Sequence, residues 1–122
     1  MTSDRHILAQ LMTVIEDRKT NPPPRSYTTK LFDGGVAKIG EKITEEAAEV
    51  VEAAEQAEDD AGRQQLVHEA ADLIYHLWVM LGHCGIPLEQ VEQELAGRFG
   101  VSGLDEKAAR QAHSPPPGGA DD

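Results

Sequence analysis

The chain has 122 residues and a formal net charge of −11 at pH 7. That charge argues against binding to nucleic acid or to an anionic membrane, because both need a basic surface. The sequence has no apolar stretch of about 18 residues, no signal-peptide pattern and a single cysteine, so it predicts a cytoplasmic protein without an internal disulfide.

Residues 7 to 18 form the first predicted helix, because apolar side chains recur there at intervals of three or four positions. Three consecutive prolines follow within residues 21 to 25, and they predict a stiff, extended connector. Beyond the connector, the hydroxyl of Ser26 can cap a short helix. A glycine pair at residues 34 to 35 then interrupts the chain.

Two long helices are predicted in the middle of the chain. Residues 36 to 58 are rich in Ala, Glu and Lys and contain no proline. Residues 63 to 83 are apolar on nearly every side after the first turns, and such a helix must be buried all round. One subunit of this length can hardly bury it, so we expect a homodimer. The predicted fold class is all-α, with subunits of four to five helices in an intertwined dimeric helix bundle.

The C-terminal part contains a fourth amphipathic helix over residues 88 to 98 and a last short helix over residues 102 to 110. Residues 111 to 122 are rich in Pro, Gly and Asp and offer few apolar side chains for packing. The predicted organisation is therefore one all-α domain over residues 1 to 110, followed by a disordered tail over residues 111 to 122.

Two acidic pairs at helical spacing are the candidate metal site. Glu46 and Glu49 share one face of a predicted helix, and Glu69 and Asp72 share one face of the next. Clustered carboxylates repel unless a cation neutralises them, and oxygen ligands select a hard ion. The alternative is a solvated acidic face, which is disfavoured because the second pair opens a strongly apolar helix. The sequence therefore predicts Mg²⁺ bound by Glu46, Glu49, Glu69 and Asp72.

Polar and charged residues near these pairs are candidate ligands of a substrate that contains phosphate. Lys42 and Lys38 precede Glu46 by one and two turns, where they can reach a polyphosphate or simply pair with neighbouring acids. His76 lies one turn after Asp72 and is either a core histidine that orients Asp72 or a substrate contact. Surface charge is the alternative for the arginines, and helix capping for the serine. The candidate substrate-binding residues are Arg18, Arg25, Ser26, Tyr27, Lys38, Lys42 and His76.

Two segments carry a family resemblance: SYTTKLFDGGVAKIGEKITEEAAEVVEAA and HEAADLIYHLWVML. With them the chain resembles the phosphoribosyl-ATP pyrophosphohydrolase family over about residues 6 to 110. That family belongs to the all-α nucleoside-triphosphate pyrophosphohydrolases, the MazG group, which are marked by ExxE followed by ExxD. The resemblance implies an obligate dimer, Mg²⁺, and hydrolysis of phosphoribosyl-ATP to phosphoribosyl-AMP and pyrophosphate in histidine biosynthesis. Because no cyclohydrolase segment precedes residue 1, we expect a monofunctional chain, unlike the fused relatives that open the purine ring as well.

Hydrolysis of the α–β phosphoanhydride needs a water in line with phosphorus, neutralised phosphoryl oxygens and a stabilised pyrophosphate leaving group. The carboxylates can meet the first two needs together with Mg²⁺. The candidate catalytic residues, one of which serves as the base, are Glu45, Glu46, Glu49, Glu69 and Asp72. Two other interpretations remain open. One is a housekeeping nucleoside-triphosphate pyrophosphohydrolase with a different nucleotide pocket, and the other is a non-catalytic acidic dimer that binds a partner or buffers metal.

Overall fold

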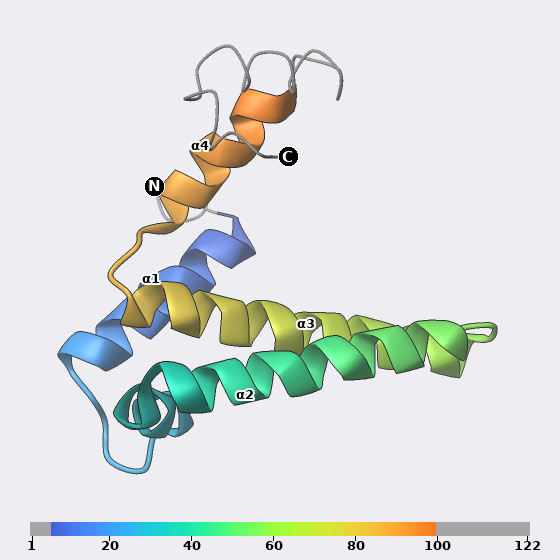
Figure 1. The fold of residues 1–122 in the computed structure, drawn as a ribbon, viewed down its shortest axis with the longest axis horizontal. Helices are drawn as coiled ribbons and strands as arrows, with labels where there is room; N and C mark the ends of the chain where they lie inside the picture. The colour runs from blue at the N-terminus through green and yellow to red at the C-terminus, as the bar shows by residue number, and fades with distance from the viewer. Residues whose placement is uncertain (1–5, 100–122) are drawn as a thin grey trace, which may run out of the picture. The chain divides into compact units, whose positions relative to one another are not determined.

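The computed structural model describes residues 6 to 99, which form helices and turns without a strand. The all-α prediction is thus confirmed. The chain divides after Leu88 into two compact units, so α4 is described separately. The last predicted helix and the predicted tail lie outside the described residues. The helices are α1 (Ile7–Thr20), α2 (Tyr27–Glu55), α3 (Asp60–His83) and α4 (Leu88–Phe99) (Figure 1).

In the first unit, α2 and α3 form an antiparallel pair, and α1 packs against both (Figure 1). The core lies where α2 begins and α3 ends. Ile15 of α1, Leu31 and Ile39 of α2, and Val79 of α3 are each at most 1% exposed. Burying one such aliphatic side chain stabilises a fold by about 1.5–3 kcal/mol. This apolar cluster therefore fixes how α2 and α3 are placed against each other.

Two polar contacts tie α1 to α3 beside this core. The Lys19 ammonium donates to the backbone oxygens of Gly82 at 2.8 Å and His83 at 3.2 Å. The indole N–H of Trp78 donates to the backbone oxygen of Leu8 at 2.8 Å. Because the last carbonyl groups of a helix lack partners within that helix, Lys19 caps the C-terminus of α3.

Helix α2 joins the predicted short helix and the predicted long helix into one kinked element. The Ser26 hydroxyl accepts a hydrogen bond from the Thr29 N–H at 3.2 Å, which confirms the predicted cap. Gly35 has φ 69° and ψ −164°, a backbone conformation that residues other than glycine rarely adopt. The glycine pair therefore interrupts the helical backbone as predicted, and the short and the long segment of α2 are two helices that meet at a kink at Gly35. The long segment ends at Glu55, before the predicted residue 58.

Helix α3 begins at Asp60, earlier than the predicted residue 63. Asp59 is its N-cap, and its carboxylate accepts a hydrogen bond from the Gly62 N–H at 2.8 Å. A Cβ atom on Gly62 would collide with the backbone oxygen of Gln56. Gly62 therefore permits a close approach in the first turn of α3, whereas the sequence pattern suggested that it belonged to the break between the helices.

The apolar surface of α3 is only partly covered in this single chain. Val79 is buried by α1 and α2, but Leu77 is 39% exposed and Val67 is 61% exposed. Among residues 6 to 99, no helix is both long enough and apolar enough to cross a membrane. In the second unit, α4 carries an ion pair of Arg98 with Glu94 at 2.8 Å.

Candidate active site

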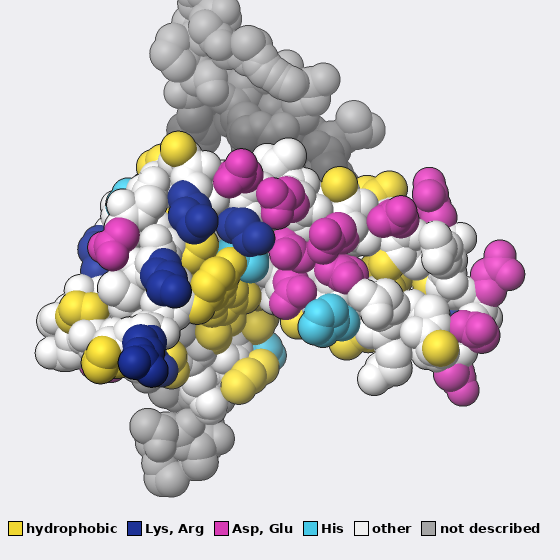
Figure 2. Space-filling view, turned by 90° about the horizontal axis from the view of Figure 1, so that it is seen from below, with side chains coloured by type: hydrophobic (Ala, Val, Ile, Leu, Met, Phe, Trp, Pro, Cys, Tyr) yellow, Lys and Arg dark blue, Asp and Glu magenta, His cyan; other side chains and the backbone are white. Residues whose placement is uncertain are grey.

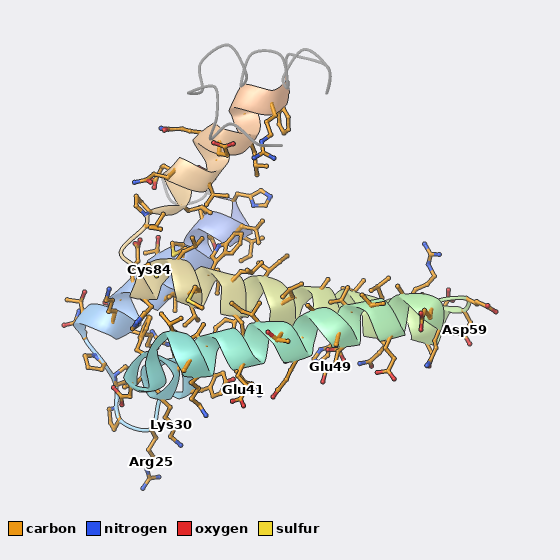
Figure 3. All side chains as sticks on the ribbon, in the orientation of Figure 1. Arg25, Lys30, Glu41, Glu49, Asp59 and Cys84 are labelled. Carbon is orange, nitrogen blue, oxygen red and sulfur yellow. The ribbon has the colours of Figure 1, made fainter. Side chains whose placement is uncertain are left out.

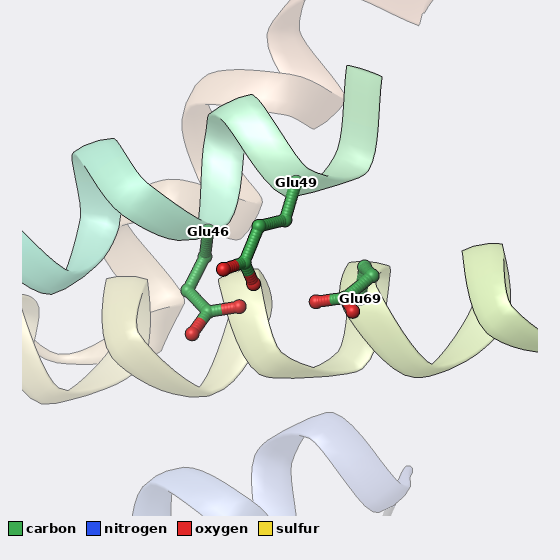
Figure 4. Close-up of side chains that lie close together, drawn as sticks. All are labelled: Glu46, Glu49 and Glu69. Carbon is green, nitrogen blue, oxygen red and sulfur yellow. The ribbon is translucent and has the colours of Figure 1, made fainter. Parts of the chain in front are cut away.

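Three glutamates from two helices bring their carboxylates together. Glu46 and Glu49 extend from α2 and Glu69 extends from α3, and one oxygen of each lies within 4.8 Å of the others (Figure 4). The spacing of three residues places the first two on one side of α2. The antiparallel packing of α3 then brings Glu69 opposite them. Three of the four predicted metal ligands thus form one cluster.

Two oxygens of this cluster are buried without a hydrogen-bond partner. They are Oε1 of Glu46 and Oε1 of Glu69. Glu46 as a whole is only 9% exposed. Ionised carboxylates accept hydrogen bonds but cannot donate them, so neighbouring carboxylates cannot satisfy these atoms. A proton or a metal cation can do so, and an all-oxygen donor set suits a hard cation such as Mg²⁺.

The electrostatics of the cluster favour uptake of positive charge. Burial raises the pKa of Glu46, and the negative charge of Asp72 raises it further. Hydrogen bonding to Glu69, followed by the charge of Glu46, raises the pKa of Glu49. Without a metal ion, a proton on Glu49 can bridge to its neighbours. The cluster therefore favours a bound cation over three separate anions.

Asp72, the fourth predicted ligand, is outside this group of three. Its Oδ2 lies 3.3 Å from Nε2 of His68, one turn earlier on α3. Asp72 nevertheless lies near enough to raise the pKa of Glu46 more than any other charged group does. Its role as a metal ligand stays a prediction.

Lys42 and Glu45 pair with each other beside the cluster. The Lys42 ammonium donates to Oε1 of Glu45 at 3.3 Å. This hydrogen bond raises the pKa of Lys42. Pairing with a neighbouring acid was the alternative to substrate binding, and the partner is Glu45 rather than Glu46. Glu45 is exposed and does not belong to the group of three.

Tyr27 and His76 are joined by a hydrogen bond, and Tyr27 lies near enough to Glu46 for that negative charge to act on it. The Tyr27 hydroxyl lies 2.9 Å from Nε2 of His76, while Nδ1 of His76 lies 2.8 Å from the backbone oxygen of Asp72. Because a carbonyl oxygen only accepts, Nδ1 carries a proton, and in the neutral tautomer with that proton Nε2 accepts from Tyr27. His76 is 5% exposed and contacts the backbone of Asp72, as the core-histidine alternative expects, and its role as a substrate contact stays a prediction. Tyr27 is 46% exposed, and the partial burial of its hydroxyl raises the pKa of that group.

Tyr75 supports Tyr27 by stacking, a contact that the sequence did not predict. The ring of Tyr75 stacks on that of Tyr27 with centroids 6.2 Å apart, and its hydroxyl contacts that of Thr28. Tyr75 lies next to His76 in the sequence, but it reads there as one more apolar position of α3. Only the packing of the start of α2 against α3 reveals its role.

The remaining predicted substrate ligands are Arg18, Arg25, Ser26 and Lys38. Arg18 approaches Asp17 at 3.9 Å on α1, and Ser26 caps α2. Arg25 is exposed at the end of the connector with φ 62°. Lys38 is also exposed, on α2. Arg25 and Glu49 extend toward the same side of the molecule (Figure 3). On that face, basic side chains gather on one side of an apolar patch and acidic side chains on the other (Figure 2).

A groove of about 370 Å³ adjoins the carboxylates on the side of the turn between α2 and α3. Most of its residues were not predicted from the sequence, because glutamine and alanine on a helix carry no distinctive signal. One of them, Gln65, donates a hydrogen bond from Nε2 to Oε2 of Glu69 at 2.6 Å. The groove is lined by Glu49, Glu52, Ala53, Gln56, Gln65 and Glu69.

Known proteins with similar sequences identify the family to which this chain is related. The family model for phosphoribosyl-ATP pyrophosphohydrolase matches residues 8 to 99, which include the whole carboxylate cluster. A phosphoribosyl-ATP pyrophosphatase from Rhodopirellula baltica is 52% identical, over 86% of this chain and 87% of the relative. Proteins of the same name from Paramagnetospirillum magneticum and Trichlorobacter lovleyi are each 47% identical. The former match covers 90% of this chain and 97% of the relative, and the latter covers 91% and 99%.

Proposed function

Because the chain belongs to the phosphoribosyl-ATP pyrophosphohydrolase family, it hydrolyses phosphoribosyl-ATP, and we propose that Glu46, Glu49 and Glu69 hold Mg²⁺ for this reaction. The products are phosphoribosyl-AMP and pyrophosphate, and the reaction is the second step of histidine biosynthesis. The observation that supports the metal site is the pair of buried, unpartnered oxygens on Glu46 and Glu69. A bound cation would give both atoms the partner that they lack.

The donor set also fits the proposed ion. Three carboxylates supply only oxygen, and they come from two helices whose packing is fixed by the core. Asp72 is the proposed fourth ligand. Mg²⁺ neutralises phosphoryl oxygens and makes water a better nucleophile when it is bound. The base that takes the proton of the attacking water belongs to the set Glu45, Glu46, Glu49, Glu69 and Asp72.

We further propose that the substrate spans both charged regions of this face. Its triphosphate lies against the carboxylate cluster, within reach of Lys42 on the next turn of α2. Tyr27 borders the site with its hydroxyl held by His76. The other candidate substrate ligands are still Arg18, Arg25, Ser26 and Lys38. The charged groups of Arg25 and Lys38 are exposed, so they are accessible to a substrate.

A homodimer is proposed as the working form. The exposed apolar side chains of α3, such as Leu77 and Val67, support this state because a second subunit can bury them. Sedimentation at low micromolar concentration should show twice the mass of the chain. A folded, active monomer at that concentration would contradict the proposal. The cytoplasmic location stays a prediction.

The test of the function compares pyrophosphate release from phosphoribosyl-ATP with release from a panel of nucleoside triphosphates. Phosphoribosyl-ATP should be the preferred substrate, and turnover should stop with EDTA and return with added Mg²⁺. Preference for an ordinary triphosphate would favour the housekeeping enzyme instead. Absence of pyrophosphate from every substrate would favour the non-catalytic dimer. Turnover that persists in EDTA would contradict the metal site alone.

A further inference from the structure

The two oxygens of Glu69 have different surroundings. Oε2 accepts a hydrogen bond of 2.6 Å from the side-chain amide of Gln65, one turn earlier on α3. Oε1 is buried and has no partner. The carboxylate of Glu69 is directed toward Glu49 on the facing helix (Figure 4). Gln65 thus holds one oxygen of the carboxylate while the other faces the cluster.

This hydrogen bond restricts a flexible side chain. A glutamate has three rotatable bonds, and an ionised glutamate beside two others is repelled toward solvent. Glu69 has partial access to solvent, so its packing alone does not prevent that rotation. The amide N–H of Gln65 opposes the rotation without adding a positive charge that would compete with a cation. Groups that orient metal ligands commonly act in this way.

We propose that Gln65 is a positioning residue of the metal site, which holds Oε2 of Glu69 so that Oε1 stays directed at the cation position between α2 and α3. The inference rests on the proposed Mg²⁺ site and deepens it. Gln65 itself does not bind the ion. Its loss should therefore weaken binding of Mg²⁺ while leaving the chemical step intact once the site is filled.

The groove provides an alternative role for the same residue. Gln65 lines it together with Gln56 and Glu52, so its amide is also accessible to a bound substrate. A substrate contact and a positioning role make different predictions. A substrate contact changes KM for phosphoribosyl-ATP at saturating Mg²⁺, whereas a positioning residue changes the affinity for Mg²⁺ in the protein without substrate.

The experiment uses Gln65→Met, which keeps the length and the helix propensity of the side chain but removes the donor. Gln64→Met is the matched control, because Gln64 is an exposed glutamine on the same helix. Glu69→Gln reports loss of a metal ligand. For each protein, calorimetry gives the Kd of Mg²⁺ without substrate, and pyrophosphate release gives the Mg²⁺ concentration at half-maximal rate.

Gln65→Met should weaken Mg²⁺ binding by on the order of tenfold, as is typical for a group that orients a metal ligand. At saturating Mg²⁺, its kcat should stay within about twofold of wild type, and Gln64→Met should match wild type throughout. Melting in EDTA checks that each variant folds, and Gln65→Ala serves if Gln65→Met does not.

The possible failures are separable. A wild-type protein that binds no Mg²⁺ would overturn the metal site and the inference together. If wild type binds the ion and Glu69→Gln does not, an unchanged Kd in Gln65→Met overturns only the positioning role. A higher KM for phosphoribosyl-ATP with unchanged Mg²⁺ affinity also overturns it and assigns Gln65 to the substrate.

Discussion

The two ends of the α2–α3 pair differ in the side chains that the helices turn toward each other: apolar at one end and acidic at the other. At one end, Ile39 and Val79 lie in a fully buried apolar core. Glu49 follows Ile39 by ten residues on α2, and Glu69 precedes Val79 by ten residues on α3. Because the two helices are antiparallel, Glu49 therefore meets Glu69. The first end stabilises the fold by excluding water, whereas the second brings like charges together at a cost. Because both ends belong to the same rigid helices, the apolar end can hold the acidic end in a geometry that it would not adopt alone.

The largest effect should come from placing a charge in the apolar end. Val79→Asp would bury an unpaired carboxylate and destabilise the protein by several kcal/mol, a large share of the stability of a small domain. We expect no folded, soluble protein. Val51→Asp makes the same chemical change at a valine that is 60% exposed, and it should fold. Circular dichroism and size-exclusion chromatography compare the two variants. A folded Val79→Asp would show that this core does not hold the helices.

At the acidic end, removing one charge should affect activity rather than folding. Glu49→Gln keeps the shape of the side chain, and kcat/KM should fall by on the order of a hundredfold or more. In EDTA the variant should melt at or above the wild-type temperature, because a repulsion is lost. Added Mg²⁺ should raise the melting temperature of wild type more than that of the variant.

Glu41→Gln is the control for this substitution, because Glu41 is an exposed glutamate of the same helix outside the group of three. It should retain wild-type turnover and the wild-type response to Mg²⁺. A Glu49→Gln protein that melts lower in EDTA yet turns over normally would show that Glu49 has a structural role instead.

The two ends should also differ in how their contribution to the stability of the fold depends on pH. The pKa of Glu46 is raised above its usual value of 4.5 by burial and by Asp72, so the folded protein binds this proton more tightly than the unfolded chain does. Its stabilising contribution is therefore complete below about pH 4.5 and is lost as the pH rises through the raised pKa. In EDTA, wild type should lose stability relative to Glu46→Gln over that rise.

Urea denaturation in EDTA at a series of pH values measures this difference. Saturating Mg²⁺ should remove much of the loss, because the cation replaces the proton as the partner of the carboxylates. Val79→Ala, which alters the apolar end, should be less stable than wild type by a similar amount at every pH. A difference between wild type and Glu46→Gln that does not vary with pH would contradict the assigned direction.

The smallest effect is expected between the two ends, at the Tyr27–His76 hydrogen bond. Tyr27→Phe removes the donor to Nε2 of His76 and should cost about 1 kcal/mol of stability. Tyr75→Phe removes a hydroxyl that contacts Thr28 and should cost a similar amount. If Tyr27 borders the substrate, only Tyr27→Phe should also lower kcat/KM, by roughly fivefold for the loss of one hydrogen bond. Equal kinetics for the two variants would place Tyr27 outside the substrate site.

Much of the fold follows from local signals in the sequence. The apolar period located α1, and the hydroxyl of Ser26 marked the start of α2. The start of α3 was misplaced because Gly62 looks like a helix breaker, although the helix needs a residue without Cβ at that point. Propensity describes a residue alone, and it does not register which backbone atom will lie against it.

The site, like the fold, was predictable from the sequence only in part. The helical period by itself determines that Glu46 shares a face with Glu49, and Glu69 with Asp72, because a helix turns once in about 3.6 residues. Only the tertiary structure decided which of these carboxylates meet. The rotation and register of α3 on α2 depend on side chains packed in the distant core, and they bring Glu69 into the group of three and leave Asp72 outside it. The hydrogen bond from Gln65 to Glu69 and the support of Tyr27 by Tyr75 likewise appear only once the side chains are placed.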